Sequence, residues 1–210
     1  SVLSQNVSKV SSETDMNNLL TQAILSADSK ISNYIEENPD SVGMGTTILL
    51  AIRRDDELFI SWCGDSHCYS YKDGKVVSIT KDHSYVQQLI DSGHITIEES
   101  FTHPNNNLIT RFVGGGEETC IPDFRTHQVS DSEMIIFCSD GLSGYCKVED
   151  ISKTIRNNHD IKELPRQLSD LAISHGSDDD ITIVVLLTKT FISHRNLGHK
   201  VEWFKKLFHL

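Results

Sequence analysis

Three acidic positions have the residue type and the setting to do chemistry, because each stands at one end of an apolar, strand-like run. Asp65 follows ISWCG, Asp140 follows MIIFCS, and Asp178, Asp179 and Asp180 precede ITIVVLL. A sheet can hold such carboxylates rigidly. If the strand ends meet, the charges repel one another unless a cation neutralises them, and oxygen-only ligands favour Mg²⁺ or Mn²⁺ over Zn²⁺. Two such ions would activate a water molecule and bind a phosphoryl oxygen.

The same acidic residues also have a structural explanation. Asp at the end of a strand commonly starts a turn or caps a helix through its side chain. The spacing of Asp65, Asp140 and Asp179 along the chain does not decide between these roles. Turn formation and metal binding therefore stay open as alternatives at this level.

The other reactive side chains favour structural roles. Neither His83 nor His103 has a second His four residues away, so we expect hydrogen-bonded or surface histidines rather than a histidine metal site. Arg111 could contact phosphate, but a structural ion pair is favoured in an acidic protein. Ser139 and Ser143 lack the Gly-x-Ser-x-Gly elbow of serine hydrolases.

The five cysteines favour a reducing compartment. Their number is odd and no Cys-x-x-Cys spacing occurs, which argues against a zinc ribbon or a redox motif. Cys63 and Cys138 lie inside apolar runs. We therefore expect free, buried thiols and a cytoplasmic location.

The composition is that of an acidic globular protein. The chain has 210 residues, with 19 Lys and Arg against 30 Asp and Glu, and a net charge of −11. This length suits one domain with a full core. The acidic balance disfavours binding to nucleic acid and to anionic lipid, since both need a positive field. No apolar run approaches the roughly 18 residues of a membrane span, and no signal peptide is visible.

Periodicity and turn signals predict the elements that would position these carboxylates. Apolar residues recur every three or four positions from Met16 to Ile35, which predicts a helix that follows a cap at Ser12 and ends before Pro39. Four strand-like runs follow with short loops: TTILLAIRR, ELFISWCG, CYSYK and KVVSIT. An Asp-Gly turn predicts a hairpin between the last two, and the short loops predict antiparallel pairing throughout.

The second half of the chain adds helices to strands. Residues 82–116 form a long irregular excursion with two short helical pieces, which is typical of functional loops. The strands FRTHQV and EMIIFCS follow, then helices over about 148–157 and from about Pro165. DITIVVLLTK is a continuous apolar run, which predicts a strand at a sheet centre. This order predicts an α+β fold with helices covering the sheets.

Two units are predicted along the chain. Residues 1–190 form the globular domain, and residues 191–210 form an amphipathic, basic tail. One face of the tail is apolar and carries Val201, Phe204, Leu207 and Phe208. That face could pack on the domain, bind a partner or lie on a membrane, and we expect no other membrane contact.

Five motifs occur in a fixed order: GTTILLAI, WCGDSHCYSYKDGKVVSITKDHSYVQQLIDSG, HPNNNLITR, FCSDGLSGY and SDDDITIVVLL. Together they closely resemble the PPM-type, or type 2C, metal-dependent protein phosphatases of the bacterial branch, over about residues 15–188. The resemblance implies a four-layer α-β-β-α sandwich of two antiparallel sheets flanked by helices. It also implies hydrolysis of phosphoserine and phosphothreonine in proteins by a metal-activated water, with no phosphoenzyme.

The resemblance further implies roles for particular residues. Asp140 in SDGL and Asp179 in DDDIT match metal ligands of a two-ion centre, and so are the implied catalytic residues. Asp65 in GDS matches a residue that, with Asp140, helps to hold a third, weaker ion. The implied cofactor is Mn²⁺ or Mg²⁺, with two to three ions in the complete family site. Residues 83–125 match a flap beside the substrate cleft. A phosphorylated protein is the implied partner, and we expect a monomer with a signalling role.

The chain departs from the family pattern in three places. His67 stands where the family usually has Arg, and Asp180 stands where it usually has Asn, but neither position supplies an implied metal ligand. The family's first strands carry an Arg that grips phosphate and an Asp-Gly-x-Gly-Gly turn that bridges the metals, and this sequence contains neither. Two interpretations stay open: a phosphatase domain presented without its first strands, or a catalytically inactive relative that acts as a protein-binding module.

Overall fold

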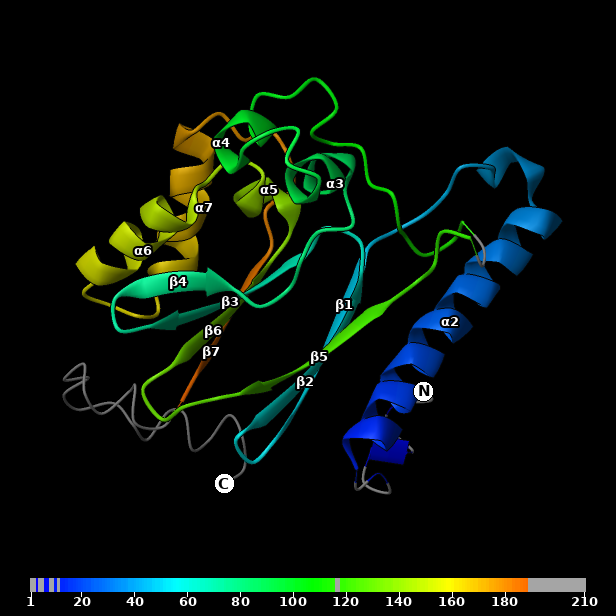
Figure 1. Ribbon diagram of the computed structural model, residues 1–210, viewed down its shortest axis with the longest axis horizontal. Helices are drawn as coiled ribbons and strands as arrows, with labels where there is room; N and C mark the ends of the chain where they lie inside the picture. Colours follow the sequence, from blue (N-terminus) through cyan, green and yellow to red (C-terminus); the bar gives the residue numbers. More distant parts are fainter. Residues whose placement is uncertain (1–2, 4–5, 8–9, 11, 116–117, 189–210) are drawn as a thin grey trace.

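Two antiparallel sheets face each other and helices cover their outer sides (Figure 1). The structure, a computed structural model, describes residues 3, 6–7, 10, 12–115 and 118–188. This arrangement confirms the α+β, four-layer sandwich expected from the sequence. The predicted tail, residues 191–210, lies outside the described residues.

The first sheet has three strands in the order β1-β2-β5. Its elements are β1 (Ile48–Arg54), β2 (Glu57–Cys63) and β5 (Asp123–Gln128), with helix α2 (Glu13–Glu37) along its outer face (Figure 1). The Ser12 hydroxyl accepts a hydrogen bond from the Asp15 N–H at 3.1 Å, which confirms the predicted cap. Met16 and Leu20 are fully buried against Phe59 of β2, so the apolar stripe of α2 fixes the helix to the sheet.

The second sheet has four strands in the order β4-β3-β6-β7. Its strands are β3 (His67–Lys72), β4 (Lys75–Ser78), β6 (Met134–Cys138) and β7 (Ile183–Leu187). The helices on its outer side are α5 (Asp140–Ser143), α6 (Val148–Asn157) and α7 (Leu164–Ser174). Ile136 of β6 packs there with Ile151 of α6 and Leu168 of α7, and all three side chains are fully buried. A further core between the sheets includes Ile60 and Ile135.

The predicted pairing of four consecutive strands is wrong at one connection. β1 pairs with β2 and β3 pairs with β4, both antiparallel, but β2 and β3 belong to different sheets. The chain changes sheet at Gly64. The backbone φ of Gly64 is 121°, a value that residues with a side chain rarely adopt. A Cβ at this position would lie 2.4 Å from Cγ2 of Thr47. The sharp turn therefore lets the chain leave one sheet and start the other within three residues.

The position predicted for the last strand is also wrong. β7 pairs with β6 alone among the described strands and lies at the edge of its sheet. Ile183, Val185 and Leu187 pack toward the helices, while Leu186 packs toward the core between the sheets. Helices pack against one face of the run and Leu186 contacts the core on the other, while Val184 stays 56% exposed. Apolar contacts on both faces do not require a central position in the sheet.

A long insertion between the two hairpins and β5 crosses one end of the sandwich. It carries α3 (Tyr85–Asp91) and α4 (Ile97–Ser100), close to the two short helical pieces predicted. Elsewhere in the chain, a turn of 3₁₀ helix, η2 (Pro39–Ser41), follows α2. Thr96 and Glu99 form a complete capping box at the start of α4. Within the described ranges, no helix is both long and apolar enough to cross a membrane.

Candidate active site

A cavity of about 700 Å³ is lined by residues of α3, α4, α5 and the start of α6. In Figure 1, α3, α4 and α5 lie together at one end of the sandwich. Asp65, Asp140 and Asp179 all line the cavity. The structure therefore brings together the three carboxylates that the sequence analysis singled out. The volume of the cavity lies within the range of roughly 300–1,000 Å³ that is usual for ligand sites.

Local structure explains why these carboxylates converge. Asp65 follows the sheet-changing turn at Gly64, Asp140 is the first residue of α5, and Asp179 lies in the loop before β7. Ser139, next to Asp140, holds the start of α5 and the loop before β7 together. The Ser139 hydroxyl donates to the Asp180 carbonyl at 3.0 Å and accepts from the Thr182 N–H at 3.0 Å.

A second bond supports the same junction. The Ser177 hydroxyl donates to the Gly141 carbonyl at 2.8 Å, while a Cβ on Gly141 would lie only 2.6 Å from the Asp180 carbonyl oxygen. The loops of Asp140 and Asp179 are thus packed backbone to backbone. Ser139 has a structural role, in agreement with the argument against a serine hydrolase.

The carboxylates perturb one another electrostatically. Burial, followed by the neighbouring charges of Asp140 and Asp82, raises the pKa of Asp65 from 3.8 to about 6. Burial and the charge of Asp179 raise the pKa of Asp140. Negative charge is therefore concentrated here at a free-energy cost, which a bound cation would offset.

His67 forms part of the wall beside these carboxylates. Its Nε2 lies 3.0 Å from Oδ1 of Asp82, its Nδ1 lies 3.0 Å from the Asp65 carbonyl oxygen, and its ring stacks on Tyr69. Burial opposes protonation, but the Asp82 carboxylate outweighs this effect and raises the pKa of His67. The Asp82 carboxylate therefore favours the protonated form of His67.

The donor chemistry of the three aspartates fits divalent cations. Carboxylate oxygens are preferred ligands of Mg²⁺, which commonly takes one or two protein carboxylates and keeps several water molecules. Among the residues that the structure describes, no three His, Cys, Asp or Glu side chains come close enough to hold one ion. The carboxylates therefore fit cations that would each take one or two of them, with water in other positions.

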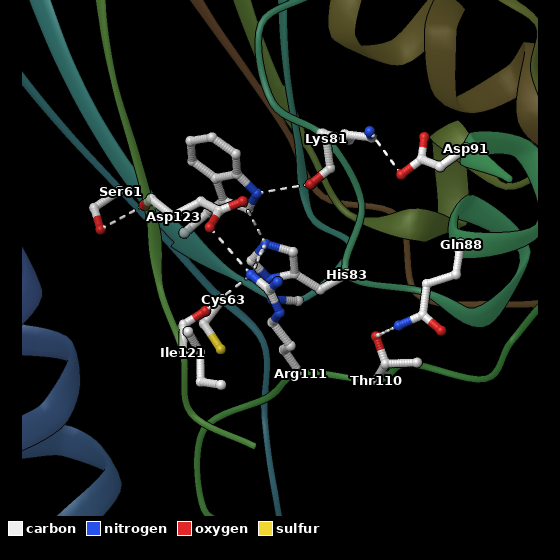
Figure 2. Close-up of polar contacts among 12 residues, drawn as sticks. Ser61, Cys63, Lys81, His83, Gln88, Asp91, Thr110, Arg111, Ile121 and Asp123 are labelled. Atoms are coloured by element: carbon white, nitrogen blue, oxygen red, sulfur yellow. Dashed lines mark hydrogen bonds and ion pairs between the residues drawn. The ribbon is translucent and has the colours of Figure 1, made fainter. Parts of the chain in front are cut away.

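A polar cluster is centred on His83 (Figure 2). The Gly64 N–H donates to Nδ1 of His83 at 3.1 Å, and Nε2 of His83 lies 3.1 Å from Oδ2 of Asp123. Trp62 stacks on the imidazole at 6.0 Å between ring centroids. Burial and the charge of Arg111 lower the pKa of His83. The predicted hydrogen-bonded role of His83 is confirmed.

Arg111 joins the insertion to the sheet. Its guanidinium donates to Oδ1 of Asp123 at 3.1 Å (Figure 2), which confirms the structural ion pair favoured by the sequence. Cys63 lies in the same cluster, and all five cysteines are free and buried, as expected. Burial raises the pKa of the Cys138 thiol, which therefore lacks the thiolate character of a nucleophile.

Sequence reasoning did not single out Asp82, Asp123 or Tyr145. Asp82 raises the pKa of Asp65, and the Tyr145 hydroxyl donates to Oδ1 of Asp178 at 2.9 Å in the cavity wall. Asp82 directly precedes His83 at the start of the insertion, a position that could have drawn attention. Tyr145 and Asp123 carry no such local signal, because only folding brings them to their partners.

Fold and cavity together define the class: a two-sheet α+β protein with a candidate divalent-cation site under a helical insertion. The family model "Protein phosphatase 2C" matches residues 1–89. The chain is 34% identical over 166 residues to the serine/threonine protein phosphatase PstP of Mycobacterium tuberculosis, covering 79% of this chain and 32% of PstP. It is 29% identical over 171 residues to the serine/threonine phosphatase Stp of Listeria innocua, covering 80% of this chain and 66% of that protein.

A solved structure extends these similarities to three dimensions. The catalytic domain of PstP in complex with two manganese ions matches with a TM-score of 0.74 and 31% identity, over 88% of this chain and 76% of that chain. The chain therefore belongs to the protein phosphatase 2C family. It spans about a third of the length of PstP and 66% of the Listeria phosphatase.

Proposed function

We propose that the protein hydrolyses phosphoserine and phosphothreonine in other proteins with the help of Mn²⁺ or Mg²⁺. The observation that carries this proposal is the convergence of Asp65, Asp140 and Asp179 in one cavity, in a chain of the protein phosphatase 2C family. In this role Asp140 and Asp179 would hold the catalytic ions, and Asp65 with Asp140 would hold a third, weaker ion. Divalent ions bound there supply a water of lowered pKa and positive charge for the phosphoryl oxygens.

The chain's own residues contribute rigidity and shape. Ser139 and Ser177 lock the loops that carry Asp140 and Asp179, so the carboxylates need little reorganisation. The insertion forms one wall of the cavity through Ser84 and Gln87 of its first part and Asn106 of its second. A cavity of this size takes a phosphorylated side chain together with its neighbours in a peptide, which supports protein substrates.

We also propose that this protein is cytoplasmic, has a signalling role and acts as a monomer. Five free, buried thiols support a reducing compartment, because disulfides are rare there. The acidic net charge of −11 supports the absence of nucleic acid among its partners.

The test is phosphate release from a phosphothreonine peptide with Mn²⁺, with EDTA and in the D179N variant. We expect turnover that depends on Mn²⁺ and is lost with EDTA or D179N. The matched control is E37Q, an exposed residue at the end of α2, which should keep the wild-type rate. Mn²⁺ binding with no phosphate release would contradict the proposal and favour the inactive, protein-binding alternative.

A further inference from the structure

Beyond the three aspartates, the cavity continues as an apolar wall on the insertion. Val86 and Ile90 of α3, Ile97 of α4 and Phe101 all line it. Ile97 keeps 62% of its surface exposed, which is high for a large apolar side chain at the mouth of a cavity. These residues, named here the flap wall, offer an apolar contact to a ligand that extends beyond the carboxylates.

The cavity is strongly acidic beyond the three aspartates as well. The remaining acidic residues that line it are Asp82, Glu98, Glu149 and Asp178. Among the described residues in its lining, Lys81 and Lys147 are the only lysine or arginine side chains. Acidic groups therefore outnumber lysines even after the three candidate metal ligands are set aside.

Both lysines are already engaged with the protein. The Lys81 ammonium lies 2.7 Å from Oδ2 of Asp91, and the Lys147 ammonium lies 6.0 Å from the centroid of the Phe101 ring. By contrast, Glu98 on the insertion and Glu149 on α6 are exposed, and neither belongs to an ion pair within the described residues. Uncompensated negative charge thus flanks the apolar wall from both sides of the cavity.

From this wall and its charges we infer the substrate class: phosphoproteins in which basic and apolar residues flank the phosphorylated residue. The inference rests on the proposed function. Metal ions would balance the phosphate and the three aspartates, but Glu98 and Glu149 would remain to attract Lys or Arg and to repel Asp or Glu. The flap wall would contact an apolar neighbour. Exposed ion pairs of this kind change binding or kcat/KM by roughly two- to fivefold each.

The experiment compares phosphothreonine peptides that differ only in their flanking residues, which are Arg, Ala or Glu. For the 210-residue chain with Mn²⁺, we measure kcat/KM for each peptide and, separately, Kd by fluorescence anisotropy. We expect kcat/KM to be roughly tenfold higher, and Kd roughly tenfold lower, for the Arg peptide than for the Glu peptide, because Glu98 and Glu149 each contribute about two- to fivefold. The preference should shrink at high salt, since screening weakens exposed charges.

Matched variants identify the residues responsible. E98Q and E149Q should each lower the ratio of the Arg to the Glu peptide by roughly two- to fivefold. The E37Q variant should leave the ratio unchanged, because Glu37 is exposed and lies outside the cavity lining. I97S should weaken binding of a peptide with a Leu neighbour more than binding of one with a Ser neighbour, because Ile97 belongs to the flap wall.

The two proposals fail in different ways. Equal kcat/KM and equal Kd for the Arg and Glu peptides would overturn the inferred substrate class while leaving the phosphatase activity in place. Preferential binding of the Arg peptide with no phosphate release would overturn the proposed function, yet it would support the binding preference. A ratio that E98Q and E149Q leave unchanged would also overturn the inference.

Discussion

His83 and Gly64 are joined by a reciprocal pair of hydrogen bonds. The His83 N–H donates to the Gly64 carbonyl at 3.1 Å, and the Gly64 N–H donates to Nδ1 of His83 at 3.1 Å. Because Nδ1 accepts, the proton of the neutral ring sits on Nε2, which faces Asp123. The N–H and the carbonyl of Gly64, the residue before Asp65, are thus both bonded to His83, one to its side chain and the other to its backbone. These two hydrogen bonds therefore join the insertion to the turn that carries Asp65.

The first prediction concerns this link. His83→Ala should destabilise the protein by about 1–3 kcal/mol, because it leaves the buried Gly64 N–H without its acceptor. His83→Asn should lose less, since its Oδ1 can stand near the position of Nδ1. Urea denaturation measures both values. Equal losses in the two variants would show that the bond from Gly64 contributes nothing.

The second prediction concerns Asp65 in the metal-free protein. Its pKa in the folded state is about 6, above the ordinary 3.8, so folding favours the protonated form. Between these two pH values the unfolded chain binds fewer protons than the folded chain, and the free energy of unfolding falls as pH rises. Above the folded pKa the full penalty, about 2–3 kcal/mol, is present.

Asp65→Asn removes this penalty. In EDTA at neutral pH the variant should therefore be more stable than the wild type by about 1–3 kcal/mol. The advantage should disappear as the pH falls toward the ordinary pKa of Asp, where both proteins carry a neutral side chain. Thermal denaturation across this pH range tests it, and a constant difference between the two proteins would contradict the assigned pKa.

The third prediction concerns metal binding. Mn²⁺ should stabilise the folded wild type, by about 2.7 kcal/mol at a concentration one hundred times its Kd. The Asp140→Asn and Asp179→Asn variants should lose most of this stabilisation, while E37Q should keep it. Melting temperatures with and without Mn²⁺ provide the readout. Full stabilisation in both variants would remove these aspartates from the metal site.

The fourth prediction concerns β7, which lies at the edge of the second sheet among the described strands. Val184 of β7 is 56% exposed, and it lines a hollow shared with Leu49 and Ala51 of β1. An exposed apolar edge strand favours association between molecules. Val184→Lys should lower aggregation on heating, as measured by light scattering, with little change in stability. Val184→Ile keeps the apolar surface and should aggregate at least as much as the wild type.

Local patterns in the sequence determined most of the elements. The cap at Ser12 and the spacing of apolar residues located α2, and the helix predicted over about 148–157 coincides with α6. The ordered motifs around Asp65, Asp140 and Asp179 also indicated the family. These signals are readable because they depend on neighbours within a few positions: helical periodicity, side-chain caps and turn-forming residues.

Tertiary structure alone decided how these elements combine. The sequence did not reveal that the chain changes sheet at Gly64, that β7 lies at an edge, or that Asp82 raises the pKa of Asp65. Nor did it pair His83 with Asp123, which lies 40 positions further along the chain. Each of these features depends on contacts between distant segments, and residue spacing says nothing about which distant segments meet. The carboxylates were named from the sequence, but only the packing of two sheets placed them in one cavity.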